Sequence, residues 1–267
     1  MDALAAIDGW GAEHAAAGVL GRMEATHGDT DYVYAWASVT KLLTGLAVLV
    51  AVEEGTVDLD EPAGPPGSTL RHLLAHASGL PPEAGPPLMA PERRRIYSNA
   101  GIEAAAELVA GHAEMPFAKY FRHALASLRL AGSLSGSPAS AYHGPLDDLL
   151  ALGRELLEPT LVAPETLAEA TTVQLPGLAG VLPSWGRQDP NDWGLAFELR
   201  DAKQPHWMGN RVSPRSFGHF GLSGTFLWVD PEAVVACGVL TDRQFGEWAK
   251  DAWPPFNDAV RRETTVD

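Results

Sequence analysis

The sequence predicts an α+β protein whose central antiparallel sheet is built from both ends of the chain and flanked by helices. Short apolar segments typical of strands lie near the start and recur after residue 190, and helical segments punctuated by Pro and Gly fill the stretch between them. Strands from the two ends must share one sheet if their apolar side chains are to be buried. We therefore expect a sheet lobe (residues 1–61 and 184–267), an inserted all-helical lobe (residues 62–183) and a cleft between them.

The first elements are expected to be a β-hairpin and a buried helix. Residues 14–22 and 32–37 are short and apolar, and Gly28-Asp29 between them is typical of a turn, so the two segments predict a hairpin. Good helix formers fill residues 38–54, with Ser38 as a possible N-cap and Gly55 as the stop. Apolar residues occur on nearly every face of this helix, which indicates that it is buried.

The remaining elements are helices first and strands second. Helices are expected at residues 70–76, 100–110, 117–128, 146–157 and 164–170, with a flexible loop at the low-complexity stretch 133–140. Strands are expected at residues 192–199, 216–221, 225–229 and 233–240, and an amphipathic helix closes the chain at residues 246–261. These late strands complete the sheet that the first strands begin.

Length and composition are those of an ordinary globular protein. The 267 residues fit one large domain or two packed lobes, and the shares of hydrophobic (46%) and charged (20%) residues argue against a disordered or membrane protein. The net charge of −15 repels nucleic-acid backbones and anionic membranes, so neither is expected as a partner. The single Cys237 excludes an intramolecular disulfide.

The start of the chain predicts a cytoplasmic protein. Its first ten residues lack both the basic segment and the continuous apolar segment of a secretory signal. The longest apolar stretch covers residues 42–52, which is well short of the roughly 20 residues that a membrane span needs.

The first of three motifs that carry chemistry is Ser38-Val39-Thr40-Lys41. Residues i and i+3 at the start of a helix share one face, so the Ser38 hydroxyl and the Lys41 amine can meet. The positive end of the helix dipole favours the neutral amine. A neutral amine beside a hydroxyl is a general base beside a nucleophile. The alternative is an N-cap serine followed by a surface lysine.

The second motif is Tyr97-Ser98-Asn99. Near a lysine cation the phenol of Tyr97 can ionise more easily than in water and can shuttle a proton. Asn99 offers both a donor and an acceptor to an ester or an amide. On its own, this motif would instead predict a buried tyrosine and a helix-capping asparagine.

The third motif is His219-Phe220-Gly221, followed by Leu222 and Ser223. Its glycines allow the backbone of an edge strand to approach a ligand closely. The backbone N–H of Leu222 is then free to act as an oxyanion donor.

Together these motifs resemble the serine β-lactamase and penicillin-binding-protein superfamily, specifically its class C-like branch. That branch has S-x-x-K, Y-x-N and a third motif in this order, and residues 36–41, 53–62, 73–81 and 221–231 also look like its consensus blocks. The resemblance covers the chain from residue 14 to about residue 260. It implies the β-lactamase/transpeptidase-like fold, with a catalytic cleft between the two lobes.

The resemblance implies a role for each matching residue. Ser38 would be the acylated nucleophile and Lys41 its activating base. Tyr97 would pass a proton to the leaving group and act as the base for deacylation, and His219 would complete the site. The oxyanion hole would consist of the backbone N–H groups of Ser38 and Leu222.

The resemblance also implies what the site binds. The substrate would be a small ester, amide or lactam, with no metal and no cofactor required; the oligomeric state stays open. Substrate contacts would come from Asn99, Phe220, Gly221, Leu222 and Ser223.

Departures from the lactamase pattern favour an esterase or amidase. In K-T-G a lysine and a threonine help to hold a substrate carboxylate, whereas here the cation is the titratable His219 and Phe220 replaces the hydroxyl. The short spacing from Tyr97 to His219 indicates a trimmed helical lobe and an open cleft. Because His219 replaces a lysine, activity is expected to change between pH 5 and 8. The alternatives are a true β-lactamase or D,D-peptidase, and a catalytically silent binding protein.

Other patterns carry weaker alternatives. His72 and His76 have the spacing of a zinc helix, but the Glu of H-E-x-x-H and a third ligand are missing, so we interpret His76 as a structural hydrogen-bonding residue. No serine lies in G-x-S-x-G, which argues against an α/β-hydrolase. Arg93-Arg94-Arg95 could bind an anion but is more typical of a solvated loop. Three tryptophans could border the cleft or pack in the core: Trp185, Trp193 and Trp207.

Overall fold

The largest sheet of the computed structural model, which describes residues 1–265, has six strands. Their order is β2-β1-β11-β10-β9-β8, and every neighbouring pair is antiparallel. Because β1 pairs along its whole length with β11, strands from both chain ends share one antiparallel sheet, which confirms the predicted fold class. The strands are β1 (Ala15–Leu20), β2 (Ala25–Gly28), β8 (Glu198–Leu199), β9 (Phe217–Gly221), β10 (Thr225–Asp230) and β11 (Val235–Thr241).

The predicted helices are present close to their expected bounds. The buried helix α1 comes first, five helices follow in the inserted stretch, and α7 closes the chain. The α-helices are α1 (Thr40–Glu53), α2 (Leu70–Leu74), α3 (Asn99–His112), α4 (Phe117–Ala124), α5 (Leu146–Leu157), α6 (Pro164–Ala170) and α7 (Glu247–Thr264). Three short 3-10 helices are η1 (Asp2–Gly9), η2 (Ala37–Val39) and η3 (Ala126–Leu128).

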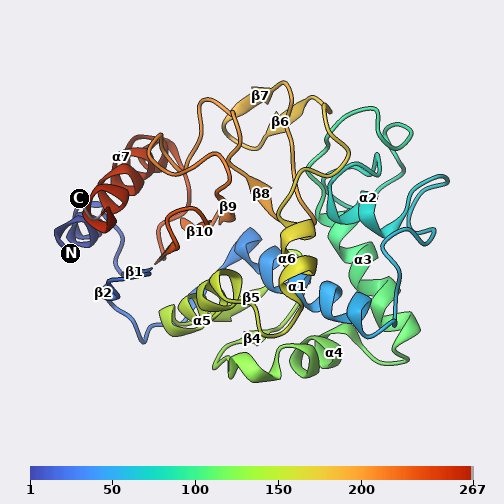
Figure 1. Ribbon diagram of the computed structural model, residues 1–267, viewed down its shortest axis with the longest axis horizontal. Coiled ribbons are helices and arrows are strands. Elements are labelled where there is room, and N and C mark those ends of the chain that lie inside the picture. The colour runs from blue at the N-terminus through green and yellow to red at the C-terminus, as the bar shows by residue number, and fades with distance from the viewer. Residues whose placement is uncertain (266–267) are drawn as a thin grey trace.

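Helices cover both faces of the large sheet. Successive side chains of a strand point to opposite faces, and in β10 Leu227 joins one hydrophobic cluster and Trp228 the other. The Leu227 cluster includes α1 and α5, whereas the Trp228 cluster includes η1 and α7. Figure 1 shows α7 beside the two chain ends at one side of the molecule, with α3 and α4 at the other.

One strand prediction fails at the hairpin. β1 pairs with β2 rather than with residues 32–37, and β3 (Tyr34–Ala35) joins a separate three-stranded sheet with β5 (Tyr142–Gly144) and β4 (Ser133–Leu134). The cause lies at Gly28, whose φ is +88° and where a Cβ would lie 2.1 Å from the carbonyl oxygen of Ala15. The chain leaves the sheet at this glycine instead of turning back into it.

The predicted strand at residues 192–199 is shorter than expected. Only Glu198–Leu199 forms β8. The backbone N–H groups of Leu195 and Ala196 donate instead to the carbonyls of Ala170 and Leu74, and Ala196 has a φ of 66° that no strand residue adopts. Another two-stranded sheet, β6 (Gly180–Leu182) with β7 (Gly186–Gln188), was not predicted. The division of the chain into two lobes stays a prediction.

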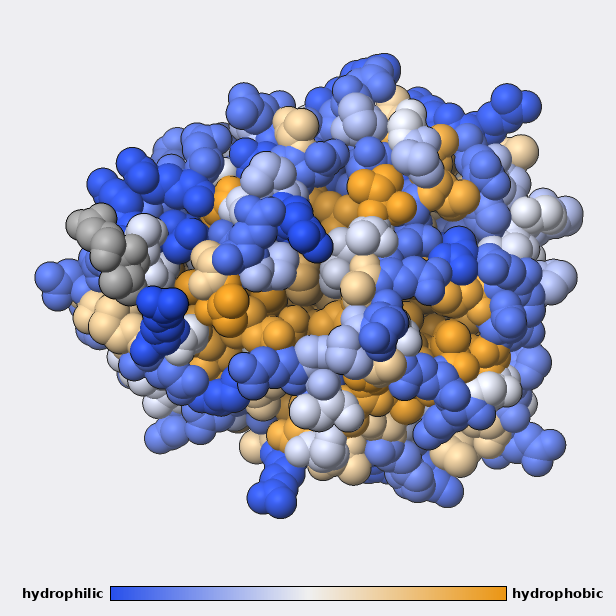
Figure 2. Space-filling view, viewed as in Figure 1, coloured by the Kyte–Doolittle hydropathy of each residue, from blue (hydrophilic) through white to orange (hydrophobic). Residues whose placement is uncertain are grey.

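The position of α1 determines where the candidate site lies. Every residue of this helix from Thr40 to Ala51 is buried, so its first turn is fixed between the sheet and the other helices. Within residues 1–265, no helix combines the length and the apolarity needed to cross a bilayer. Figure 2 shows mostly hydrophilic side chains on the viewed face, with hydrophobic ones grouped toward its middle.

Candidate active site

The three predicted motifs meet around one hydroxyl at the start of α1. Ser38 lies in η2, Lys41 in the first turn of α1, Tyr97 just before α3 and His219 in β9. The O–H of Tyr97 donates to Ser38 Oγ over 2.7 Å, and Nζ of Lys41 lies 3.1 Å from the same oxygen. Nε2 of His219 lies 3.5 Å from the Tyr97 oxygen. The structure therefore brings together side chains from three distant parts of the sequence.

The turn that presents Ser38 is held tightly against β9. Ala37, directly before Ser38, has a φ of 45°, which residues with a Cβ rarely adopt. A Cβ at Gly221 would lie 2.4 Å from the carbonyl oxygen of Trp36, so only glycine allows this approach. The hydroxyl of Thr225 donates to the same carbonyl over 2.9 Å. In this structure Gly221 holds the serine turn in place.

Lys41 is fully buried beside Ser38. Its Nζ also donates to Oδ1 of Asn99 over 2.6 Å and to the carbonyl of Ala139 over 2.9 Å. Burial lowers the pKa of Lys41 to about 7, against the opposite effect of nearby carboxylates, chiefly Glu83. A neutral amine keeps two N–H groups for Asn99 and Ala139 and leaves its lone pair for the Ser38 hydroxyl. Burial, more than the helix dipole, is thus the source of the neutral amine.

Tyr97 is held as a proton donor to Ser38. Burial raises the pKa of Tyr97 above its usual range, and the hydrogen bond to Ser38 offsets this only in part. The expectation that a lysine cation eases the ionisation of Tyr97 is wrong. The physical reason is that burial disfavours the phenolate, while Lys41 is itself about half neutral near pH 7.

His219 is buried and neutral near pH 7. Its Nδ1 lies 2.7 Å from the carbonyl oxygen of Phe220, and because a carbonyl only accepts, Nδ1 carries the proton and Nε2 offers its lone pair toward Tyr97. Burial, followed by the nearby Lys41, lowers the pKa of His219 to about 4. The expected change of His219 charge between pH 5 and 8 is therefore wrong.

Asn99 links Lys41 to a residue that sequence reasoning missed. Its Oδ1 accepts from Lys41, and its Nδ2 donates to Oε1 of Glu83 over 2.8 Å. The second bond fixes which end of the amide faces the lysine. Glu83 lies in the Pro- and Gly-rich stretch 81–87, which has no pattern that could have predicted its position.

Comparison with known proteins shows the family to which the chain belongs. The model of the family described as Beta-lactamase matches residues 3–260. The chain belongs to the β-lactamase family. A solved structure described as a β-lactamase from Mycobacterium bovis is 50% identical in sequence, covers 99% of this chain and 100% of its own, and superposes with a TM-score of 0.96. The resemblance inferred from the motifs is therefore confirmed.

More distant members of this fold carry other activities. A mutant of simvastatin synthase (LovD) from Aspergillus terreus is 18% identical, with 98% of this chain and 96% of that chain covered and a TM-score of 0.80. EstCE1, described as a hydrolase with promiscuous acyltransferase activity, is 17% identical over 96% and 95% of the two chains, with a TM-score of 0.76. At these identities the likeness shows the fold alone. No curated protein sequence matches the chain.

A cavity of about 510 Å³ opens beside Ser38 in this β-lactamase fold. Tyr97, Asn99 and His219 contribute polar groups to it, and Glu198, which sequence reasoning also missed, lies in its lining. The rest of the lining is largely apolar and includes Pro82, Leu88, Met89, Ile96, Trp193 and Leu222. The cavity is large enough for a small substrate.

The third motif is used differently from the β-lactamase pattern. Phe220 is nearly buried and packs in an aromatic cluster with Trp207 and Phe245, while a part of it lines the cavity. Leu222 is exposed and lines the cavity as expected. Ser223 does not fit its predicted role as a substrate contact: it lies outside the cavity lining, because its hydroxyl turns inward to Thr225 at 3.2 Å.

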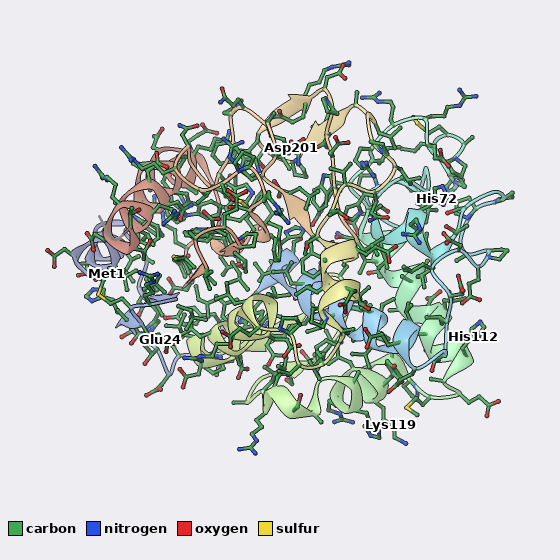
Figure 3. All side chains as sticks on the ribbon, in the orientation of Figure 1. Met1, Glu24, His72, His112, Lys119 and Asp201 are labelled. Atoms are coloured by element: carbon green, nitrogen blue, oxygen red, sulfur yellow. The ribbon has the colours of Figure 1, made fainter. Side chains whose placement is uncertain are left out.

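The two histidines of α2 and its end are structural. His72, labelled on α2 in Figure 3, is buried and bonds through its two ring nitrogens to Thr69 and Glu92. His76 accepts the backbone N–H of Ser98, as its structural interpretation requires. Nowhere in residues 1–265 do three or more His, Cys, Asp or Glu side chains lie where they could hold a metal ion.

The arginine run and the tryptophans divide between surface and interior. Arg94 is exposed and lines the cavity, whereas Arg95 is buried and donates to backbone carbonyls, so the prediction of a solvated loop is wrong for Arg95.

Of the three tryptophans, Trp193 lines the cavity, while Trp185 and Trp207 pack in the core.

Proposed function

We propose that this chain is a serine hydrolase that forms an acyl-enzyme on a small ester or amide. The observation that carries the proposal is the paired contact at Ser38, where a buried amine with a pKa of about 7 and a phenol O–H reach one hydroxyl oxygen. A fold alone does not imply an activity. Here the base and the proton donor each lie within hydrogen-bonding distance of the nucleophile, beside a cavity, which is what acyl transfer requires.

In the acylation step, neutral Lys41 takes the proton of Ser38 while Oγ attacks the carbonyl carbon. The carbonyl electron pair moves onto its oxygen, which we assign to the backbone N–H groups of Ser38 and Leu222. When that pair returns, the bond to the leaving group breaks and the leaving atom takes the proton of Tyr97. The Lys41 ammonium then returns a proton to the phenolate, which restores both side chains.

In the deacylation step, water attacks the acyl carbon and gives its proton to neutral Lys41. The bond to Ser38 Oγ then breaks, and the ammonium returns the proton to that oxygen. We assign the base in this step to Lys41 because burial keeps Tyr97 protonated. Tyr97 contributes its O–H as the donor that stabilises charge on Oγ.

We assign positioning roles to His219 and Asn99. Nε2 of neutral His219 lies beside the Tyr97 oxygen and offers a second acceptor for the Tyr97 O–H when that O–H is not bonded to Ser38. Asn99 holds the Lys41 amine through its Oδ1, so that the lone pair faces the serine. Neither residue has to change its charge during the reaction.

We further propose that esters and simple amides are better substrates than β-lactams. The position of the lactamase cation is taken by neutral His219, and Glu83 adds a negative charge to the cavity lining. Arg94 also lines the cavity, but it is exposed, so water screens its attraction for a substrate carboxylate. The cytoplasmic location stays a prediction.

The test compares hydrolysis of p-nitrophenyl butyrate with hydrolysis of nitrocefin, in the wild type and in Ser38→Ala. We expect a higher kcat/KM for the ester, and loss of both activities in the variant. Nitrocefin turnover far above ester turnover would support a true β-lactamase instead. Equal turnover by wild type and Ser38→Ala would exclude Ser38 as the nucleophile. A folded wild type with no turnover of either compound would support the silent binding protein.

A further inference from the structure

Three exposed hydrophobic side chains meet at the cavity beside Ser38. Leu88, Val181 and Leu222 are 59%, 51% and 55% exposed, and all three line this cavity. They come from distant parts of the chain: the loop before α3, strand β6, and the turn between β9 and β10. Single exposed hydrophobic residues are common, but several gathered at one cavity mark a binding surface. We call these three residues the apolar rim.

The backbone holds the apolar rim in place. The N–H of Leu88 donates to the carbonyl of Gly79 over 2.9 Å, which closes the loop that carries Leu88. Val181 is paired within the β6–β7 ladder. The carbonyl of Leu222 accepts from the N–H of Phe245 over 2.8 Å. The three side chains therefore start from fixed points of the backbone.

The apolar surface continues from the rim toward the reacting groups. Met89, Ile96 and Pro183 line the same cavity and are half-buried, so they form its inner wall. Met89 follows Leu88 in the chain, and Ile96 directly precedes Tyr97. The wall thus begins next to the site of proton transfer and ends at the rim.

The charges of the cavity lining cancel in number, although the whole chain carries a net charge of −15. The lining has two acidic and two basic side chains: Glu83, Glu198, Arg94 and Arg95. Arg95 is buried and donates to backbone carbonyls, and Glu83 accepts from Asn99. The lining therefore favours a ligand without net charge.

We propose that the substrate carries an apolar chain longer than a butyryl group, which lies along the apolar rim while the carbonyl group lies at Ser38. Such contact removes apolar surface of both partners from water, which is the source of the binding energy. The inference rests on the proposed function and narrows its substrate class to neutral esters or amides with an extended apolar chain. It assigns Leu88 and Val181 to selection of the substrate and leaves the chemistry at Ser38 unchanged.

The first test varies the chain length on each side of the ester bond. p-Nitrophenyl octanoate and butyrate differ only in the acyl chain, whereas octyl and butyl acetate differ only in the alcohol chain. A fully buried methylene group contributes about fourfold to binding. Because the rim leaves part of the chain in water, we expect kcat/KM to favour the longer ester by about tenfold or more in total. The series that shows this preference identifies the part of the substrate that carries the chain.

Variants of the rim connect the preference to these residues. Val181→Ser replaces two exposed methyl groups with a hydroxyl, so the ratio of long-chain to short-chain kcat/KM should fall about threefold or more. Leu88→Ser should lower the ratio in the same way. Val33→Ser is the matched control, because Val33 is similarly exposed but lies outside the cavity lining. It should leave the ratio unchanged.

Binding of two ketones tests the rim without turnover. 2-Nonanone and 2-pentanone carry the same chains as the two p-nitrophenyl esters beside a carbonyl group, but they have no leaving group and cannot be hydrolysed. We expect 2-nonanone to bind wild type about tenfold more tightly than 2-pentanone, measured by calorimetry. This advantage should shrink in Val181→Ser and stay the same in Val33→Ser.

Each result has a distinct meaning. Equal kcat/KM for long and short esters in both series would overturn the inference, while ester hydrolysis itself would stand. A preference that is the same in wild type, Val181→Ser and Leu88→Ser would overturn the role of the apolar rim. If no ester is hydrolysed, the proposed function fails, and the ketone comparison alone decides whether the rim selects a chain. If one of the two serine variants does not fold, the other decides.

Discussion

The chain buries two lysine amines, one beside Ser38 and one next to β8, in different surroundings. Burial lowers the pKa of Lys41 to about 7 and that of Lys203 to about 8. Nζ of Lys203 donates to two backbone carbonyls, which can only accept. Nζ of Lys41 has a hydroxyl among its partners, and a hydroxyl can reverse the bond and donate its proton. Burial makes an amine easier to deprotonate, but only a partner that can lose a proton makes it a useful base.

The largest expected difference is between the variants Lys41→Met and Lys203→Met. Lys41→Met removes the base, so kcat/KM for p-nitrophenyl butyrate should fall about 10³-fold. Lys203→Met leaves two buried carbonyls without a donor and should lower the free energy of unfolding by about 1–3 kcal/mol, measured by urea denaturation. The activity of the folded Lys203→Met protein should stay within about tenfold of wild type. Similar activity losses in the two folded variants would contradict the comparison.

The next effect concerns the second donor at Ser38. Tyr97→Phe removes the O–H that reaches Ser38 Oγ, and kcat/KM should fall about 10²-fold. Tyr34→Phe is the matched control, because its buried O–H donates to the carbonyl of Asp29 in another part of the molecule. Full activity in Tyr97→Phe would show that Lys41 alone carries out every proton transfer of the reaction.

A smaller effect is the dependence of the rate on pH. Because neutral Lys41 is the base, kcat/KM should rise with pH up to about 7 and level off above it, so that the value at pH 6 is about a tenth of the plateau. His219, with a pKa lowered to about 4, should add no inflection between pH 5 and 8. The neutral state of His219 would be contradicted by a second inflection between pH 5 and 8 that disappears in His219→Asn. The rise in rate due to Lys41 would remain in that variant.

The smallest effect is expected at Glu83. This carboxylate raises the pKa of Lys41 against the larger effect of burial, so Glu83→Gln should shift the acid limb of the rate profile to lower pH. The gain in rate at pH 6 should stay below about tenfold, because Glu83 is exposed and water screens its charge. The glutamine can still accept from Asn99. Glu107→Gln serves as the control, because Glu107 is an exposed carboxylate on α3. It should leave the pH dependence of the rate unchanged.

The sequence predicts those parts of the site that depend on local spacing. Ser38 and Lys41 stand three residues apart at the start of a helix, and that spacing is sufficient to bring them together. The motif order and the family resemblance place Tyr97 and His219 near them. No such local pattern predicts Glu83, Glu198 or the carbonyl of Ala139. Their positions depend on how distant loops and strands pack.

Charge states are harder to predict than positions. The sequence suggests a readily ionised Tyr97 and a titrating His219, but burial moves the pKa of both groups away from physiological pH. Burial is a property of the folded chain and cannot be predicted from a short motif. The misplaced strand at Tyr34–Ala35 has the same origin, because its partner β5 lies more than a hundred residues away in the sequence.

The most direct test of the central claim is labelling with a fluorophosphonate probe followed by intact mass measurement. If Ser38 is activated by Lys41 and Tyr97, wild type should gain one adduct, Lys203→Met should label like wild type, and Lys41→Met should label far more slowly. Ser38→Ala should gain none. Absence of an adduct on folded wild type, or equal labelling of Ser38→Ala, would contradict the account.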